Sequence, residues 1–199
     1  MAKKIKSNLD RRAVINKILD KRGDALIVTG LGSSCYDVGA AGDNPLNFYL
    51  WGAMGSAAMI GLGLALAQPK RQVIVITGDG EMLMGLGALA TIGSQAPRNL
   101  SIVVIDNELY SETGMQPTHT ARGVDLPAMA KAAQFPRTAT IANEAQLKTW
   151  VPKLYAPQGA AFVSIKVNSA RYPLSTKLRD GAYIKARFRE ALLGTASYD

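Results

Sequence analysis

Gly78-Asp79-Gly80-Glu81 is the stretch that decides the fold of this 199-residue chain. A β-branched run at residues 73–77 comes directly before it and predicts a buried strand. Glycines let the backbone approach a ligand closely, and the free N–H groups at a helix start favour phosphate. The stretch therefore predicts a strand, a tight turn and a helix, with an anion-binding site at the turn.

A second polar position follows the next predicted strand. Residues 101–106 are predicted as that strand, and Asn107 comes directly after it, with residues 81–106 separating it from Gly80. Ligands of parallel sheets bind at the carboxyl ends of strands, so Asp79 and Asn107 are expected side by side. Mg²⁺ takes one or two such oxygen ligands and completes its shell with phosphate oxygens. The pattern favours a diphosphate–metal site over a purely structural turn.

The spacing from Asp79 to Asn107 resembles the motif of thiamine diphosphate (ThDP) enzymes, in which an Asn follows a GDG turn at this distance. The element GAMG at residues 52–55 resembles the one that grips the aminopyrimidine ring of ThDP in that family. The resemblance implies that the Gly52 carbonyl accepts a hydrogen bond from the cofactor's amino group and that Met54 wedges between its two rings. Taken alone, Met54 would equally fit the core at a helix start.

Two longer stretches narrow the resemblance to decarboxylases within the ThDP enzymes. Residues 84–100 and 114–120 resemble the diphosphate-binding half of phosphonopyruvate decarboxylase and the β subunit of sulfopyruvate decarboxylase. The similarity runs over about residues 26–136. Trp51 and residues 106–112 depart from the family pattern, which leaves the substrate open.

The resemblance also implies a set of cofactor ligands. The side chains of Asp79 and Asn107 and the carbonyl of Leu109 would bind Mg²⁺. Three backbone amides, two small hydroxyl residues and one aromatic ring would face the diphosphate: Gly80, Glu81, Met82, Ser33, Ser34 and Tyr110. On the residues alone, the two serines equally fit a turn that caps a helix, and the tyrosine equally fits the core.

Three polar side chains near the motif are candidates for substrate contact. His119, the only histidine, lies in a Gly/Pro-rich loop past the metal ligands and could transfer protons. Glu112 lies where decarboxylases of this family place a proton-donating acid, and Arg122 could bind an anionic substrate. A solvated surface position is the competing interpretation for each. Together with Met54, His119 and Glu112 are the predicted catalytic residues.

The chain is long enough for one domain with its own core, and no internal repeat indicates a second copy. The decarboxylases that it resembles carry two similar α/β domains with the cofactor between them, and the pyrimidine-binding domain supplies an activating glutamate. Glu81 does not suit that role, because it lies beside the diphosphate. The resemblance therefore implies a second subunit that carries the pyrimidine-binding domain and this glutamate, in a hetero-oligomer where this chain alone is inactive.

Composition and charge argue against several other classes. No apolar run reaches about 18 residues, so a soluble, cytoplasmic protein without a membrane span is expected. No signal-peptide core follows the basic residues 1–6. The single Cys35 cannot form an internal disulfide or an iron–sulfur cluster. The net charge of +8 lies mainly at the two ends, which fits a solvated surface or an acidic partner rather than nucleic acid.

Strands that alternate with helices predict an α/β fold, with a doubly wound, mostly parallel sheet and helices on both faces. The expected parts are a basic N-terminal helix at residues 1–22, the ThDP diphosphate-binding domain at 23–167 and a basic, partner-docking tail at 168–199. Within the domain, residues 35–46 are predicted as a loop and residues 82–95 as one helix.

The predicted reaction follows from the cofactor. ThDP would act as the electron sink while a small anionic 2-oxoacid, similar to sulfopyruvate or phosphonopyruvate, loses CO₂ and becomes an aldehyde. Two alternatives stay open: a carboligase subunit similar to acetolactate synthase, and a non-catalytic cofactor-binding subunit. The intact set of Asp79, Asn107 and Met54 argues against the second. An NAD-binding domain fits less well, because the first strand lacks a clean G-x-G-x-x-G.

Overall fold

The computed structural model describes residues 7–175 and 178–198, and a six-stranded sheet forms its centre. The strand order is β2-β1-β3-β4-β8-β7, and every neighbouring pair is parallel. The strands are β1 (Leu26–Thr29), β2 (Asn47–Tyr49), β3 (Val73–Gly78), β4 (Leu100–Asp106), β7 (Arg137–Ile141) and β8 (Ala161–Lys166). The predicted α/β fold with a parallel sheet is confirmed.

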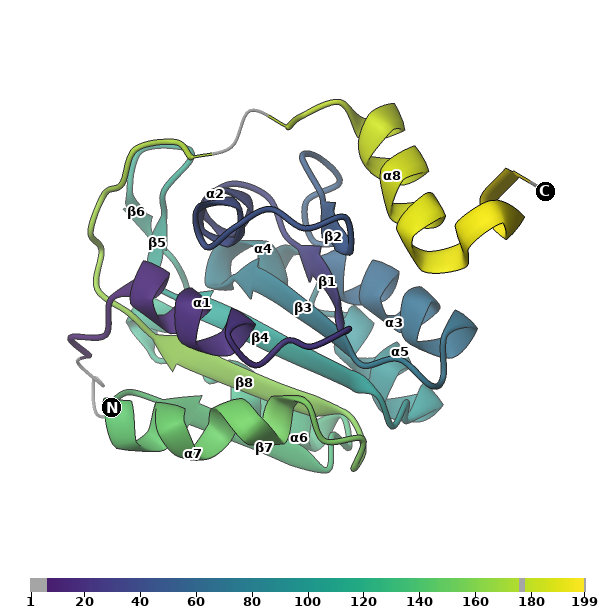
Figure 1. The fold of residues 1–199 in the computed structure, drawn as a ribbon. Coiled ribbons are helices and arrows are strands. Elements are labelled where there is room, and N and C mark those ends of the chain that lie inside the picture. Colours follow the sequence, from purple (N-terminus) through teal and green to yellow (C-terminus); the bar gives the residue numbers. More distant parts are fainter. Residues whose placement is uncertain (1–6, 176–177, 199) are drawn as a thin grey trace.

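Each face of the sheet is covered by its own helices (Figure 1). Successive side chains of a strand point to opposite faces, so Ile74 of β3 joins one core and Val75 joins the other. One core lies beneath α1 (Arg11–Leu19), α2 (Ser33–Ala40) and α7 (Glu144–Leu154), and the other beneath α3 (Ala57–Ala67), α5 (Ala88–Gln95) and α6 (Leu126–Ala132). Burial on both faces explains why the central strands are almost entirely apolar.

The strand order reverses between β1 and β3. From β1 the chain moves outward to the edge strand β2, and it then returns to place β3 on the other side of β1. In doubly wound sheets, the crevice outside the carboxyl ends at such a point is where ligands bind. β1 ends at Thr29 and β3 ends at Gly78, so the GDGE turn opens into this crevice.

The prediction of a loop at residues 35–46 was wrong for its first half, because α2 continues to Ala40. The helix contains few strong helix formers, and its first turn has no side-chain cap. It is held by tertiary packing instead: Cys35 and Val38 are fully buried against the sheet. A local reading of the sequence could not detect that support.

The prediction of a single helix at residues 82–95 was also wrong. A short helix, α4 (Asp79–Met84), begins inside the GDGE stretch, and α5 follows after an irregular segment. The break occurs where Gly85 packs directly on the backbone of Gly55, and a Cβ on Gly85 would overlap the Gly55 carbonyl oxygen. The loop at residues 52–55 therefore fixes the end of α4.

A small antiparallel hairpin follows β4, which the sequence did not predict. It consists of β5 (Leu109–Tyr110) and β6 (Gln116–Pro117), and a 3₁₀ turn, η1 (Thr120–Arg122), comes after it. The Thr118 amide donates to the Glu108 carbonyl at 2.9 Å and closes the hairpin base. The hairpin brings the segment after Asn107 back toward the sheet edge.

The C-terminal segment packs on this chain itself. Helix α8 (Gly181–Leu193) lies against the edge strand β2, and its buried side chains are Ile184 and Phe188 (Figure 1). The Phe188 ring meets Phe48 edge-on at a centroid distance of 5.5 Å. A 3₁₀ turn, η2 (Gly194–Tyr198), follows. The buried side of α8 thus packs within this chain, and docking of the tail on a partner stays a prediction.

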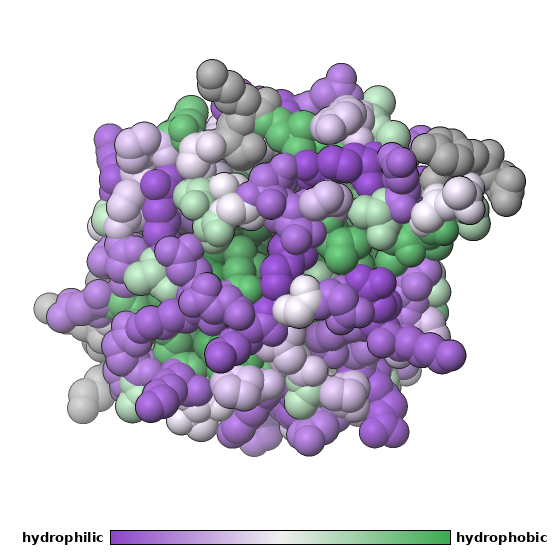
Figure 2. All heavy atoms as spheres, viewed as in Figure 1, coloured by the Kyte–Doolittle hydropathy of each residue, from purple (hydrophilic) through white to green (hydrophobic). Residues whose placement is uncertain are grey.

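At the N-terminus, only Arg11–Leu19 of the helix predicted at residues 1–22 is helical among the described residues, and residues 1–6 lie outside them. The face seen in Figure 2 is mainly hydrophilic, with hydrophobic residues in small separate areas. Within residues 7–175 and 178–198, none of the helices has the length and apolar character needed to cross a membrane.

Candidate functional site

A cavity of about 130 Å³ opens at the carboxyl edge of the sheet. The loop after β1, the start of α4, the end of β4 and the β5–β6 hairpin form its walls. Ten of the predicted site residues line it: Ser33, Ser34, Met54, Asp79, Gly80, Glu81, Asn107, Leu109, Tyr110 and Glu112. The fold therefore brings most of the predicted site together from four separate parts of the sequence.

Asp79 begins α4 directly after β3, and only 2% of it is exposed. Its Oδ2 accepts a hydrogen bond from Thr118 Oγ1 at 2.6 Å and lies 3.1 Å from Thr120 Oγ1. Burial, and next the nearby charge of Asp106, raise the pKa of Asp79 to about 6. A cation bound beside this carboxylate would favour its charged form instead.

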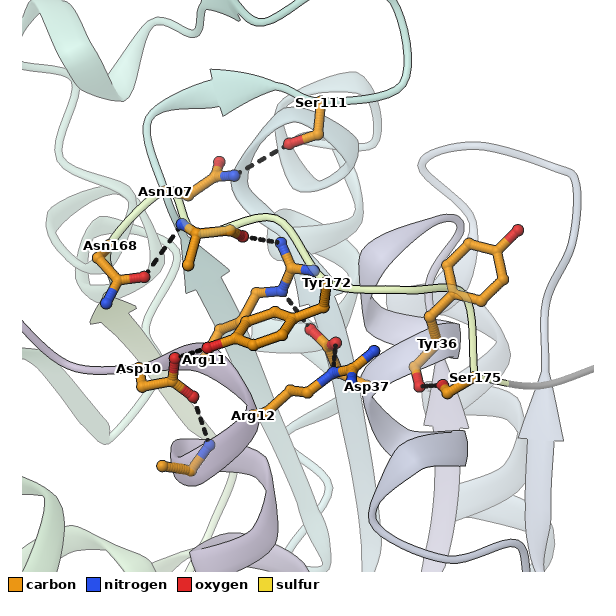
Figure 3. Close-up of polar contacts among 12 residues, drawn as sticks. Asp10, Arg11, Arg12, Tyr36, Asp37, Asn107, Ser111, Asn168, Tyr172 and Ser175 are labelled. Carbon is orange, nitrogen blue, oxygen red and sulfur yellow. Dashed lines mark hydrogen bonds and ion pairs between the residues drawn. The ribbon is translucent and has the colours of Figure 1, made fainter.

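Asn107 lies just past β4, where the hairpin begins. Its Nδ2 donates to Ser111 Oγ at 3.0 Å (Figure 3), and its Oδ1 accepts from the Leu109 amide at 3.0 Å. An amide oxygen has two lone pairs, so Oδ1 can accept this bond and still serve as a metal ligand. The two bonds hold the side chain at the cavity wall that Leu109 shares.

The Glu81 side chain joins three loops around the cavity. Its Oε2 accepts from Thr77 Oγ1 at 2.7 Å and from the Leu31 amide at 3.0 Å, and the nearby Gly55 amide favours the charged form of the carboxylate. Burial raises the pKa of Glu81 against the effect of these donors. A Cβ on Gly30 would overlap Oε2. From the sequence, Glu81 was expected to offer a backbone amide, and its side chain was judged unsuited to be the activating glutamate, so this role of the side chain was not predicted.

Met54 stands at the rim of the cavity with 56% of its surface exposed. The residues on either side of it have left-handed backbone conformations, with φ of 52° at Ala53 and 86° at Gly55. Gly55 is supported from behind by its close contact with Gly85. The element at residues 52–55 is therefore an exposed turn, and Met54 is not a core residue.

Four residues named from the sequence do not line the cavity. Gly52 is exposed just before the Met54 turn, and the Met82 side chain is part of the core, which leaves its predicted amide contact untested. His119 and Arg122 are exposed at η1 and are not among the described residues that line the cavity. The geometry therefore gives no support to the predicted catalytic role of His119.

A cluster of two arginines and one aspartate, of which Arg11 and Asp37 are buried and Arg12 is half-buried, adjoins the cavity and was not predicted from the sequence. Arg11 Nε and Arg12 Nε donate to the two oxygens of Asp37 at 2.6 and 3.0 Å (Figure 3). Arg11 and Asp37 line the cavity. Because one carboxylate faces two guanidinium groups, the cluster carries a net positive charge. Asp37 lies in the part of α2 predicted as a loop, so its pairing with the N-terminal helix could not be foreseen.

Residues 32–165 match the family described as thiamine pyrophosphate enzyme, C-terminal TPP binding domain. This match covers more than half of the chain and includes the GDGE turn, Asn107 and the Met54 loop. The chain therefore belongs to this family of thiamine pyrophosphate (ThDP) enzymes, as the motif spacing predicted.

Several similar relatives are decarboxylases. The chain is 43% identical over 127 residues to sulfopyruvate decarboxylase subunit beta of Methanothermobacter thermautotrophicus, which covers 64% of this chain and 68% of the relative. It is 34% identical over 187 residues to sulfopyruvate decarboxylase of Methanosarcina acetivorans, which covers 92% of this chain and 47% of the relative. The chain is thus a homologue of the β subunit of a ThDP decarboxylase and spans about half the length of the second relative.

A solved structure supports the fold. Benzoylformate decarboxylase from Polynucleobacter necessarius superimposes with a TM-score of 0.69, over 83% of this chain and 34% of that one. The two sequences are 19% identical over this region, so the likeness concerns the fold alone.

The residues of the cavity fit a diphosphate held through a divalent cation. Asp79 and Asn107 offer side-chain oxygens and Leu109 offers a carbonyl, which are the hard ligands that Mg²⁺ prefers. Tyr110 packs on Gly80, where a Cβ would overlap its ring. The lack of a side chain at Gly80 therefore keeps the backbone at the start of α4 close to the cavity.

Proposed function

We propose that this chain is the diphosphate-binding subunit of a two-chain, ThDP- and Mg²⁺-dependent enzyme. The enzyme would decarboxylate a small anionic 2-oxoacid of the sulfopyruvate or phosphonopyruvate type to an aldehyde. The observation that carries the proposal is the meeting of Asp79, Asn107 and Leu109 in one cavity at the strand-order reversal. The names of the two sulfopyruvate decarboxylase relatives support the substrate class.

Each residue has a definite part in this proposal. Asp79 and Asn107 would hold Mg²⁺ through side-chain oxygens, and Leu109 through its carbonyl. The amides at the start of α4, beginning with Gly80, would bind the diphosphate, because the first N–H groups of a helix have no intrahelical partner and favour negative charge. ThDP, when bound, supplies the electron sink for the loss of CO₂. Met54 would support the cofactor rings and exclude water from them.

The opposite wall of the cavity would contact the remaining groups. Ser33 and Ser34 form the first turn of α2, and both line the cavity, so they would add hydroxyl and amide donors for the diphosphate. The Glu112 side chain reaches over Gly32, where a Cβ would meet its carboxylate. We assign Glu112 as the candidate proton donor, because it is the exposed acid on the cavity wall nearest this loop.

A second subunit would complete the site. Complete pockets for small molecules usually measure about 300–1,000 Å³. The cavity here, at about 130 Å³, is smaller, as expected of one wall of a shared site. The partner would supply the pyrimidine-binding domain and the activating glutamate. A cytoplasmic location stays a prediction.

Calorimetric titration of ThDP with Mg²⁺ tests the proposal, on this chain alone and on the chain co-expressed with a candidate partner subunit. We expect tight binding only in the complex, with its loss in Asp79→Ala. Asp20→Ala, which removes an exposed acid at the end of α1, is the matched control and should bind normally. Absence of binding in every sample would refute the proposal.

Product analysis separates the two reactions open to the complex. With sulfopyruvate or phosphonopyruvate, the proposal predicts CO₂ and the corresponding aldehyde in equal amounts. The result would be different for a carboligase. When a second aldehyde is added, the amount of ligated product would then match most of the CO₂ released.

A further inference from the structure

The return side of the hairpin brings two threonine hydroxyls to the buried carboxylate of Asp79. Thr118 is 1% exposed, and its Oγ1 donates to Asp79 Oδ2 at 2.6 Å. Thr120 Oγ1 lies 3.1 Å from the same oxygen and 2.9 Å from Thr118 Oγ1. His119, between them, is exposed. Both threonine hydroxyls thus point into the protein, toward Oδ2 of Asp79.

Thr120 also connects Asp79 to a second buried carboxylate. Its Oγ1 lies 2.9 Å from Asp106 Oδ1. Asp106 is fixed from the other side, because its Oδ2 accepts from Ser164 at 3.0 Å and pairs with Lys166 Nζ at 2.8 Å. The Lys166 charge offsets part of the cost of burying Asp106. Thr120 therefore contacts a carboxylate whose other oxygen is held by Ser164 and whose charge is balanced by Lys166.

Both threonine contacts use Oδ2, so Oδ1 is the oxygen of Asp79 that they leave for a metal ion. Groups that hydrogen-bond to a metal ligand orient it and tune its affinity. One hairpin carries this arrangement: Asn107 and Leu109 lie on its outgoing side and Thr118 on its return. Formation of the hairpin therefore places the candidate metal ligands Asn107 and Leu109 and the Asp79 partner Thr118 at the same time.

We propose that Thr118, supported by Thr120, is a positioning residue for the metal ligand Asp79, which it holds by Oδ2 so that Oδ1 faces the cation. The inference rests on the proposed function of the site. Thr118 acts through Asp79 and not on the substrate. Its loss should therefore weaken Mg²⁺ binding while leaving the rate at saturating Mg²⁺ close to that of the wild type.

The test compares Thr118→Val, which keeps the shape and removes the hydroxyl, with Thr118→Ser, which keeps the hydroxyl. Calorimetry would measure Mg²⁺ affinity at saturating ThDP in the assembled two-subunit enzyme. Thr118→Val should bind Mg²⁺ about 10- to 100-fold more weakly, since that is the usual effect of losing a partner of a metal ligand. Thr118→Ser should restore affinity. In kinetics, the Mg²⁺ activation constant should rise in Thr118→Val with kcat largely retained.

Ser101→Ala is the matched control for a structural effect. Ser101 is fully buried at the opposite end of β4, and its hydroxyl donates to the Leu154 carbonyl at 2.7 Å. It should lower thermal stability without changing Mg²⁺ affinity. If Thr118→Val does not assemble, Thr120→Val carries the same test, because it removes the hydroxyl behind Thr118.

Two outcomes distinguish the inference from the function on which it rests. Wild-type binding that is lost in Asp79→Ala but unchanged in Thr118→Val and Thr120→Val would overturn the positioning role alone. Absence of Mg²⁺-dependent ThDP binding in the wild-type complex would overturn the proposed function and the inference with it.

Discussion

Glu81 shows how one side chain can set the shape of a whole site. Its carboxylate accepts hydrogen bonds from the Thr77 hydroxyl at the end of β3 and from the Leu31 amide after β1, and the Gly55 amide beside Met54 favours its charged form. These three segments form separate walls of the cavity. A buried carboxylate needs such donors, because burial without them is costly. The stretch that suggested an anion-binding turn thus also contains the residue that joins its surroundings.

Gly30→Ala tests this junction, because the new Cβ would overlap Glu81 Oε2. We expect the free energy of unfolding to fall by about 1–3 kcal/mol, the usual cost of overpacking. In a Glu81→Ala background the same substitution should cost clearly less, since the side chain that it displaces is absent. Denaturant unfolding of the four variants measures the difference, and equal costs in both backgrounds would contradict the role of Glu81.

Cys35 gives a prediction in pH. Burial raises the pKa of its thiol to about 12. Since the thiolate is the nucleophile, iodoacetamide at pH 8 should label the native protein slowly and the denatured protein rapidly. A raised native pKa means that the native state keeps a proton that the unfolded state loses. The resulting stability is complete below the ordinary pKa of 9.0 and is lost as the pH rises through about 12.

The pH dependence of unfolding checks the second half of that prediction. The free energy of unfolding of the wild type should decline between about pH 9 and pH 12 more steeply than that of Cys35→Ala. Parallel curves for the two proteins, or rapid labelling of the native thiol, would show that Cys35 is not sequestered as the structure describes.

At the scale of elements, the break between α4 and α5 supports the Met54 loop. The break contains Gly85, which lies so close to the Gly55 backbone that a side chain at this position would overlap it. The break therefore lets the turn at residues 52–55 sit against the end of α4. The turn at residues 52–55, predicted to contact the aminopyrimidine ring, and α4, predicted to contact the diphosphate, therefore depend on each other for their positions.

Gly85→Ala and Gly87→Ala form a matched pair for this contact. A Cβ on Gly85 meets the Gly55 backbone, whereas a Cβ on Gly87 meets nothing within 4 Å and its φ of −59° suits alanine. Gly87→Ala should be neutral or stabilise by about 0.4–1 kcal/mol. Gly85→Ala should destabilise by about 1–3 kcal/mol and weaken ThDP binding in the complex. Equal effects in thermal unfolding and calorimetry would contradict the interpretation.

At the scale of the whole molecule, described segments near both ends of the chain contact the elements around the candidate site. Residues 168–175 run beside α1 and α2: Arg11 Nη1 donates to the Ala170 carbonyl at 3.0 Å, and Tyr172 bonds to Asp10 (Figure 3). Farther along, Trp51 Nε1 donates to the Leu178 carbonyl at 2.7 Å, just before the Met54 turn. The described parts of the two terminal regions, which were expected to face a partner, thus also contact the elements around the cavity.

The exposed methionines at the cavity rim mark the side on which a partner is expected. Met54 and Met84 are 56% and 58% exposed, and both line the cavity. Methionine is enriched in protein interfaces. Met84→Glu should weaken association with the partner subunit, as measured by sedimentation, and change the stability of this chain by less than about 0.5 kcal/mol. Met129→Glu on α6 is the control, and equal weakening by both variants would contradict this assignment.

Much of this molecule could be predicted from local patterns. The β-branched strands, buried on both faces, and the spacing of Asp79 and Asn107 are local signals, and they gave the fold class, the sheet edge and the candidate metal ligands. The prediction failed where stability comes from distant contacts. α2 depends on the burial of Cys35 and Val38, and the sequence around them has no strong helical pattern.

The sequence by itself determined the class of fold and the chemistry of the candidate ligands, because residue type and strand periodicity can be read from short stretches of sequence. Only the tertiary structure decided which side chains stand behind those ligands. Thr118 is 39 residues from Asp79 along the chain, and Glu81 is 50 residues from Leu31. Such pairs meet because parallel strands lie side by side and because the hairpin returns the chain to the sheet edge. A local sequence pattern does not specify which distant segments come into contact in this way.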